Sequence, residues 1–404
     1  MPRDHAHHTM PISRRLSRRA FAAGGVALAL GLVGCGGKSN TPAEIVATPT
    51  PEPTQAPPMP TQPPIASPVA GYLDPKRWAG RTLTVATAGV GDYLDALTSA
   101  FFDAFAHDTG AVVRHEQFGR DGTANLMSQV DEGEILWDVM LVPMNAVLDL
   151  SEQGYLTAID YNVVDNSALY PQLTLQHGVG AEMYSTTMVY SVSREEGPAD
   201  WADFWNLQLF DGTRALRRSP VGTLEFALLA DGVQIDKLYP LDTERAFASL
   251  EKIREATLFY EDSKQPVELV RTGQVGLASA WTVRTTLPDV ASLVTPVWNQ
   301  GMISADAWVT PRGTPNTDVA MSFINYATRA VPTANFSRLQ PFGPVNQDAL
   351  KLLKLELLET LPNYVENFGL QFFENLSYWR DHRDRLTAQF EDWLLNPPAT
   401  PEVE

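Results

Sequence analysis

Strand-like and helix-like segments alternate along the folded part of the chain. A β-branched run at residues 81–86 ends in a glycine turn, and apolar residues then recur at helical spacing as far as Gly110, where a C-terminal cap is expected. Residues 111–118 predict a second strand, 124–132 a second helix, and 136–142 an apolar strand typical of a buried parallel sheet. This order predicts right-handed crossovers and a doubly wound α/β lobe.

A second alternating series follows the first. Strands are predicted near 184–190, 215–216, 275–280, 294–298 and 307–310, and helices at 201–205, 220–230, 242–257, 318–328 and 379–394. The folded part, from Leu73 to Pro397, holds about 320 residues, more than one typical core accommodates. The expected architecture is therefore two lobes, each built from a sheet flanked by helices.

Aromatic residues stand beside carboxylates in the segments that follow predicted strands. These pairings are Asp92-Tyr93, Phe259-Tyr260-Glu261-Asp262, Trp281, and Asp306-Ala307-Trp308. In open α/β sheets ligands bind beyond the carboxyl ends of strands, so these segments are expected to face one cleft. An ammonium ion binds over a ring face with its N–H groups on a carboxylate, and the pairings therefore indicate a site for an amine. Each aromatic taken alone is more typical of a core.

Residue spacings typical of enzymes and metal sites do not occur in the sequence. It has no Gly-x-Ser-x-Gly elbow, His-Glu-x-x-His motif, Walker-type loop or zinc-binding cysteine pair. Beyond Cys35 the chain carries 25 basic and 47 acidic residues, a net charge of −22, which argues against nucleic acid as a partner. No cofactor or metal is expected, and an enzyme survives only as a remote, carboxylate-based alternative.

The only cysteine, Cys35, ends a segment with the layout of an export signal. Arginines between residues 14 and 19, followed by Phe21, resemble the twin-arginine signature, and the Leu-Val-Gly-Cys ending resembles a bacterial lipobox, which implies lipid attachment at Cys35. Residues 36–72 are rich in Pro and Thr and predict an extended tether. The alternative is an uncleaved membrane helix, which the three glycines in the run disfavour. Met10 is an alternative start.

Several stretches carry a resemblance to a known family. They are Trp137–Pro143 with Gly154–Leu156, Trp201–Asn206 with Phe210–Gly212, Gly276–Trp281, Asp306 followed by Pro311 and Gly313, and Pro341–Asn346. From Arg81 to about Leu394 the sequence resembles the solute-binding proteins of ABC importers, most closely the spermidine/putrescine-binding group. The resemblance implies a type II periplasmic-binding-protein-like fold, α/β and two-lobed, with a mixed, mainly parallel sheet in each lobe and a hinge of crossing segments.

The same resemblance implies the roles of individual residues. Trp281 corresponds to the ring over a polyamine chain, and Asp306 to the carboxylate that takes an ammonium end. Asp92 and Tyr93 lie where the group has an acid and a tyrosine after the first strand. The remaining expected ligand-binding residues are Asn145, Tyr184 and Arg218.

Two departures from the polyamine group keep a second ligand class open. Polyamine binders share an aromatic residue two positions before the aspartate that corresponds to Asp306, and this chain has Ser304 there. The chain also has Arg217-Arg218 where the group offers acids. Arg218 in a cleft would repel a second ammonium and receive a carboxylate, so a zwitterionic, amino-acid-like or opine-like solute is the alternative. Arg217 and Arg218 pointing to solvent is an equally open interpretation.

The expected organisation follows from these observations. Residues 1–35 are a signal with lipobox, 36–72 a tether, 73–188 the first lobe, 189–302 the second, 303–335 a return to the first, and 336–404 C-terminal helices with a disordered tail. The expected function is capture of a small amine-bearing solute, such as spermidine or putrescine, by hinge closure, and its delivery to an ABC permease with its ATPase. The expected protein is a monomer, extracytoplasmic and lipid-anchored.

Overall fold

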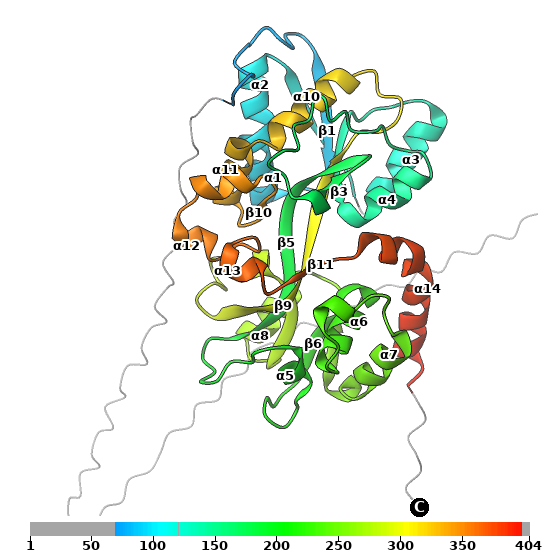
Figure 1. The fold of residues 1–404 in the computed structure, drawn as a ribbon, viewed down its shortest axis with the longest axis vertical. Helices are drawn as coiled ribbons and strands as arrows, with labels where there is room; N and C mark the ends of the chain where they lie inside the picture. Colours follow the sequence, from blue (N-terminus) through cyan, green and yellow to red (C-terminus); the bar gives the residue numbers. More distant parts are fainter. Residues whose placement is uncertain (1–68, 120, 398–404) are drawn as a thin grey trace, which may run out of the picture. The chain divides into compact units, whose positions relative to one another are not determined.

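The computed structural model describes residues 69–119 and 121–397 (Figure 1). Cys35, the signal and most of the tether lie outside the described residues. The strands are β1 (Thr82–Thr87), β2 (Val112–Gln117), β3 (Val139–Pro143), β4 (Thr174–Leu175), β5 (Gly178–Ser191), β6 (Arg214–Arg217), β7 (Thr257–Tyr260), β8 (Leu277–Trp281), β9 (Val294–Val309), β10 (Gly343–Pro344) and β11 (Phe372–Phe373).

The helices surround these strands. They are α1 (Gly91–Leu97), α2 (Asp103–Thr109), α3 (Gly122–Glu132), α4 (Met144–Glu152), α5 (Trp201–Trp205), α6 (Pro220–Ala230), α7 (Thr243–Glu251), α8 (Gln265–Arg271), α9 (Thr282–Thr285), α10 (Thr317–Ala327), α11 (Ala330–Leu339), α12 (Leu355–Leu358), α13 (Val365–Phe368) and α14 (Leu376–Leu395). Within the described residues, none of them has both the length and the apolar composition required to cross a bilayer.

Two long strands, β5 and β9, connect the two halves of the sheet. The strand order is β2-β1-β3-β9-β5-β8-β6-β7. Parallel pairs form β2-β1-β3 on one side and β8-β6-β7 on the other. β9 pairs antiparallel with β3, β5 pairs antiparallel with β8, and β5 and β9 pair with each other along most of their length (Figure 1). Residues 184–191 and 298–306, which the sequence suggests as the segments that cross between the lobes, lie within these two strands.

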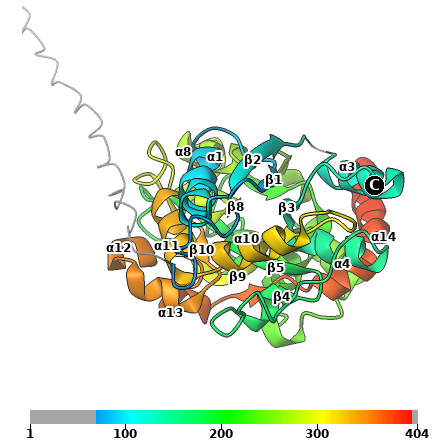
Figure 2. The ribbon, with the colours of Figure 1, turned by 90° about the horizontal axis from the view of Figure 1, so that it is seen from above.

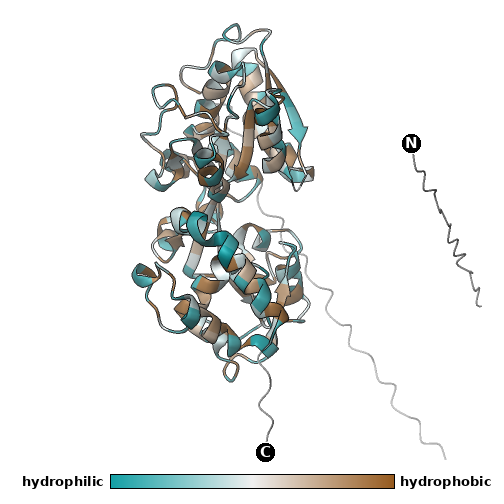
Figure 3. Cartoon of the chain, turned by 90° about the vertical axis from the view of Figure 1, so that its right-hand side faces the viewer, coloured by the Kyte–Doolittle hydropathy of each residue, from teal (hydrophilic) through white to brown (hydrophobic). Residues whose placement is uncertain are grey.

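Each half of the sheet has its own apolar core. The first gathers large side chains such as Phe101, Phe105 and Trp308 with helices α1, α2 and α10. The second gathers Trp201, Trp379 and other side chains from α5, α6, α7 and α14. Apolar segments are concentrated in the strands and the inner faces of the helices (Figure 3), and Figure 2 shows α4 and α14 side by side in the view from above. Both cores draw residues from β9, whose Trp308 belongs to the first and Met302 to the second.

Most of the predicted elements are present with shifted bounds. Gly110 caps α2 in the left-handed conformation, with φ of 76°, as its position predicted. The strands predicted at 294–298 and 307–310 are one strand, β9. The helix predicted over 242–257 is wrong beyond α7, because residues 257–260 pair with β6 as the strand β7.

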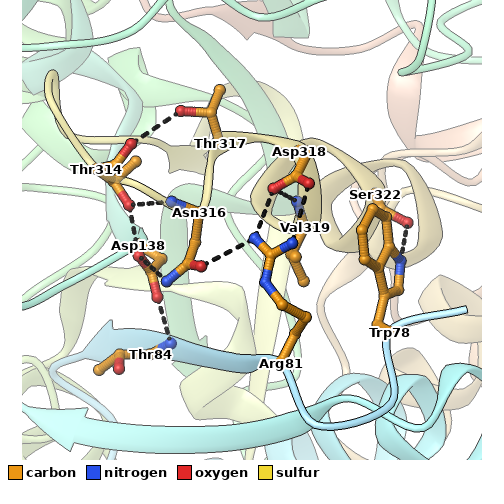
Figure 4. A network of polar contacts seen from close by, with 10 residues as sticks. All are labelled: Trp78, Arg81, Thr84, Asp138, Thr314, Asn316, Thr317, Asp318, Val319 and Ser322. Atoms are coloured by element: carbon orange, nitrogen blue, oxygen red, sulfur yellow. Dashed lines mark hydrogen bonds and ion pairs between the residues drawn. The ribbon is translucent and has the colours of Figure 1, made fainter.

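A network of polar contacts ties β1 and β3 to the start of α10 (Figure 4). The buried carboxylate of Asp138 accepts the backbone N–H of Thr84 at 2.8 Å and the amide of Asn316 at 3.1 Å. Arg81 donates to the Asn316 side chain at 3.0 Å and pairs with Asp318 at 2.9 Å. Asp138 therefore serves the fold of the first lobe.

A buried arginine organises the entrance to the second lobe. The Arg214 side chain is fully buried, and its guanidinium donates to the carbonyls of Phe204 at 2.8 Å and Gly212 at 2.7 Å, and to those of Asn206, Phe210 and Asp211. Burial lowers the pKa of Arg214 to about 10. A single cation thus satisfies five carbonyl groups of the segment between α5 and β6.

Candidate functional site

A cavity of about 200 Å³ lies against the crossing strands and takes residues from both halves of the sheet. Its lining comes from α4, β5, β6, α6, β8, β9 and the C-terminal segment. The lining residues are Asn145, Tyr184, Thr186, Arg217, Ser219, Val221, Thr223, Phe226, Ser279, Trp281, Met302, Ser304, Glu374, Arg383 and Thr387.

One face of β5 and β9 forms the floor of this site. Side chains on a strand alternate between faces, so Tyr184 and Thr186 share a face of β5, as Met302 and Ser304 share a face of β9. The register pairs Tyr184 with Ser304 and Thr186 with Met302. The same face continues to a third pair, Glu182 with Asp306.

An aromatic wall is built by Trp281 and Tyr184. Trp281 is the last residue of β8 and pairs with Thr186 of β5. The Tyr184 and Trp281 rings have centroids 5.1 Å apart at an interplanar angle of 53°. The Arg217 guanidinium lies over the Trp281 ring, with Cζ 4.9 Å from its centroid. The wall therefore presents a ring system and a cation together.

Arg217, and not Arg218, lines the cavity. Arg217 is the last residue of β6, whereas Arg218 has left the strand and donates its backbone N–H to Tyr260. The Arg218 guanidinium forms an ion pair with Glu391 at 2.5 Å and lies 3.6 Å from Glu261. The arginine that lines the cavity is therefore Arg217, and not Arg218 as the sequence suggested.

The amino-terminal turn of α6 forms the wall next to Arg217. Ser219 caps this turn by accepting the Val221 N–H, and the Thr223 hydroxyl donates to the Arg217 carbonyl at 3.2 Å. Gly222 has φ of 80°, a left-handed conformation that favours glycine. This kink delays the regular helix, so the cavity meets the positive end of the α6 dipole.

Glu374 and Arg383 from the C-terminal segment close the opposite wall. The Asn145 side chain bridges them, donating to Glu374 at 3.0 Å and accepting from Arg383 at 3.3 Å. Glu374 also accepts the Ser304 hydroxyl at 3.0 Å. The remaining buried donors of Arg383, Nε and Nη2, have no hydrogen-bond partner among the described residues. A buried donor without an acceptor in this wall is consistent with a ligand acceptor.

A pair of acids, the buried Glu182 and the half-buried Asp306, lies next to the cavity on the same strand face. Glu182 accepts the Tyr93 hydroxyl at 2.6 Å, and the register of β5 and β9 places Glu182 opposite Asp306. Burial raises the pKa of Glu182, as does the neighbouring Asp306 charge, and burial raises the pKa of Asp306 to about 6. The like charges of these two neighbouring carboxyl groups disfavour their ionisation together.

The predicted site residues fall into three groups. Asn145, Tyr184 and Trp281 line the cavity, whereas Tyr93 and Asp306 belong to the adjacent acid pair. Asp92 is exposed at the start of α1 and is not among the lining residues, and neither is Arg218. Arg217 was named only as a neighbour of Arg218, and Glu374 and Arg383 were not predicted at all.

Comparisons with known proteins agree with this architecture. Residues 100–362 match the model of the bacterial extracellular solute-binding protein family. A γ-aminobutyric acid-binding protein of Pseudomonas aeruginosa is 30% identical over 321 residues, which cover 78% of this chain and 91% of that protein.

Solved structures show the same likeness. The structure of a GABA receptor has a TM-score of 0.72 and 30% identity, covering 80% of this chain and all of that one. The binding protein AgtB from A. tumefaciens, in complex with agropinic acid, has a TM-score of 0.66 and 29% identity, covering 78% of this chain and 99% of that one. The fold class expected from the sequence, a two-lobed periplasmic-binding-protein-like fold, is thereby confirmed.

These matches define the kind of protein, although they do not confirm the polyamine-binding type. Proteins of this kind bind small molecules and work with a permease and an ATPase, and they are not enzymes. The chain therefore belongs to the bacterial extracellular solute-binding protein family and is the substrate-binding component of an ABC transporter.

Proposed function

We propose that this protein captures a small solute that carries both an amine and a carboxylate, with 4-aminobutyrate as the first candidate. The observation that supports this most strongly is the pair of arginines, Arg217 and Arg383, in the cavity lining. Two cations disfavour a purely cationic polyamine and favour a ligand carboxylate. The relatives that bind γ-aminobutyric acid and agropinic acid support the same ligand class.

The carboxylate end of the solute is proposed to bind between Arg217, Arg383 and the amino-terminal turn of α6. Arg383 has two buried donors without a partner among the described residues. The α6 turn adds the positive end of a helix dipole on the same cavity. Together these groups supply charge-assisted hydrogen bonds to a carboxylate.

The amine end is proposed to bind against Glu374 and the aromatic wall. Glu374 already accepts from Asn145 and Ser304, so its position in the cavity is fixed. Tyr184 supplies a ring face that attracts an ammonium ion, whereas the neighbouring Trp281 ring carries the Arg217 guanidinium. A volume of about 200 Å³ is below the range typical of drug-sized ligands, which suits a solute of this size.

Titration calorimetry with 4-aminobutyrate, putrescine, spermidine and an opine tests this proposal. We expect 4-aminobutyrate or the opine to release heat with 1:1 stoichiometry, and putrescine to bind more weakly, because it has no carboxylate for the arginines. X-ray scattering of the same samples is expected to show a smaller radius of gyration with ligand, since the solute contacts both lobes and favours hinge closure. Tight binding of spermidine with no response to either zwitterion would refute the proposal.

A polyamine is the second candidate, and the acid pair of Glu182 and Asp306 is the observation that favours it. Both carboxyl groups lie on the strand face that continues from the cavity, and Tyr93 donates its hydroxyl to Glu182. A cationic group reaching this pair would stabilise its ionised form. The calorimetric comparison above separates the two ligand classes.

We further propose that Cys35 anchors the protein to the membrane through a lipid, as the lipobox-like ending indicates. Replacing Cys35 with serine is expected to move the protein from the membrane fraction to the soluble fraction, because serine provides no thiol for the lipid. Fractionation and immunoblotting measure the shift. The released protein is expected to bind solute with unchanged affinity; loss of binding together with release would contradict the separation of tether and receptor.

A further inference from the structure

A buried glutamate, Glu225, lies directly behind the cavity. Its side chain is fully buried in the second core, on α6 one turn after the Gly222 kink. Three donors converge on it: the Gly222 N–H at 2.9 Å, the Tyr239 hydroxyl at 2.6 Å and the Trp379 indole N–H at 2.7 Å. Glu225 itself is not among the residues that line the cavity.

The first of these contacts fixes the cavity wall. Gly222 lies between Val221 and Thr223, which both line the cavity. The Gly222 N–H donates to the Glu225 carboxylate, so a hydrogen bond from the core side stabilises the left-handed turn. This turn carries the positive end of the α6 dipole, and any shift in it moves that end relative to the cavity.

The third contact fixes the opposite wall. Trp379 and Arg383 are four residues apart on α14 and therefore project from the same side of the helix. The indole of Trp379 is bonded to Glu225, whereas Arg383 reaches the cavity and Asn145 of α4. α14 packs against both α6 and α4 (Figure 1). Glu225 thus joins the two elements that carry the cavity's cationic wall.

We infer that Glu225 is a positioning residue for solute recognition, which holds the α6 turn and the Arg383 helix in the arrangement that receives a carboxylate. This inference rests on the proposed function for its ligand, 4-aminobutyrate. Glutamine at this position keeps the shape but offers one acceptor oxygen in place of two, so it cannot satisfy all three donors. The wall is then held by fewer contacts.

Titration of Glu225 provides a signature that a purely structural role would not. The titratable groups that act on it are Tyr239, Tyr378 of α14 and Glu374 before α14. Two bases of α14 lie one group further away: His382 stacks on the Tyr378 ring with centroids 4.3 Å apart, and the Arg385 charge acts on Tyr378. Burial raises the pKa of Glu225 to about 7. Because the folded-state pKa is raised, the proton is held below about pH 7 and occupies an acceptor position there. The carboxylate accepts all three donors only above that pH.

The test measures 4-aminobutyrate binding by calorimetry between pH 6 and 8 in wild type and Glu225→Gln. We expect wild-type affinity to weaken as the pH falls through about 7, whereas amine and carboxyl groups of the ligand titrate near about 10 and 4 and stay charged. Glu225→Gln is expected to bind about tenfold more weakly at pH 8, the loss of one charge-assisted hydrogen bond, and to lack the pH dependence. Unchanged affinity and an unchanged pH profile in a folded variant would overturn the inference.

Glu251→Gln is the matched control. Glu251 also accepts an indole N–H from α14, that of Trp393 at 2.9 Å. Its other partner is Arg254, so none of its described hydrogen bonds reaches the α6 turn. This variant is expected to keep wild-type affinity and pH profile. A tenfold loss in both variants would show that any loosening of α14 weakens binding, and would contradict a role specific to Glu225.

A ligand-free measurement separates failure of this inference from failure of the proposed function. If wild type gives no heat with 4-aminobutyrate, the proposed ligand is wrong. The indole N–H resonance of Trp379 and the amide resonance of Gly222 are then followed by NMR from pH 6 to 8. Both are expected to shift with a midpoint near 7 in wild type and not in Glu225→Gln. Absence of this titration in wild type would refute the inference without any ligand.

Discussion

Replacing Arg217 with alanine is expected to weaken 4-aminobutyrate binding on the order of 100-fold, whereas Arg218→Ala is expected to change it by less than about threefold. The two arginines are adjacent in sequence, but only Arg217 lines the cavity, over the Trp281 ring. Removing it takes away a charged partner of the ligand carboxylate. Removing Arg218 breaks a partly exposed ion pair with Glu391, which is worth little.

Calorimetry on both variants, with 4-aminobutyrate and with putrescine, measures this difference. Putrescine has no carboxylate, so Arg217→Ala is expected to leave its binding unchanged or to strengthen it, because a repulsive charge is removed. The ratio of the two affinities therefore reports the role of Arg217 independently of a general disturbance of the site. Equal losses in both arginine variants, or equal losses for both ligands, would contradict the assignment.

Replacing Arg214 with methionine is expected to lower the free energy of unfolding by about 3–5 kcal/mol, the largest stability change predicted for this protein. The guanidinium is fully buried and donates to five backbone carbonyls between α5 and β6. Methionine fills similar space but leaves those carbonyls without donors, and each buried unpaired group costs about 1–3 kcal/mol before relaxation.

Urea unfolding followed by tryptophan fluorescence measures the loss, and Arg245→Met is the control. Arg245 is an arginine of the same lobe whose side chain is 43% exposed and pairs with Asp231, so its replacement is expected to cost less than about 1 kcal/mol. Comparable losses in the two variants would show that the carbonyl cluster around Arg214 is not the source of stability.

The fold could be predicted from the sequence because its elements carry strong local signals. The glycine cap at Gly110 and the apolar run of β3 are examples, and both are present in the structure. The strand β7 was missed because its pairing with β6 is a tertiary interaction that follows no helical or strand period in so short a segment. β9 was divided in two because the gap between the predicted strands, residues 299–306, holds a single β-branched residue, Ile303. β5 nevertheless pairs with residues 294–297 and 302–306, on either side of an irregularity in the register.

The site could be predicted only in part. Trp281 ends an apolar strand and Asn145 follows another, so strand-end reasoning found both. Arg217 and Arg218 are adjacent in sequence, and which of them lines the cavity depends on where β6 ends. The structure shows that Arg217 is the last residue of that strand. Glu374 and Arg383 come from the C-terminal segment that includes α14. Charged residues are frequent along this segment, and such a pattern is typical of a solvent-exposed helix face. The place of these two residues in the cavity depends on the packing of α14 against α4 and α6.

The placement of β9 between β3 and β5 has a consequence for synthesis of the chain. β1 starts at Thr82 and β3 ends at Pro143, but β9, the partner of β3, spans Val294–Val309. At about 5–20 residues per second, the ribosome supplies that partner on the order of ten seconds or more after β3 has emerged. During this interval the edge of β3 is unpaired on the nascent chain and is a natural place for a chaperone to bind. A chain that stops before residue 294 would keep that edge open permanently.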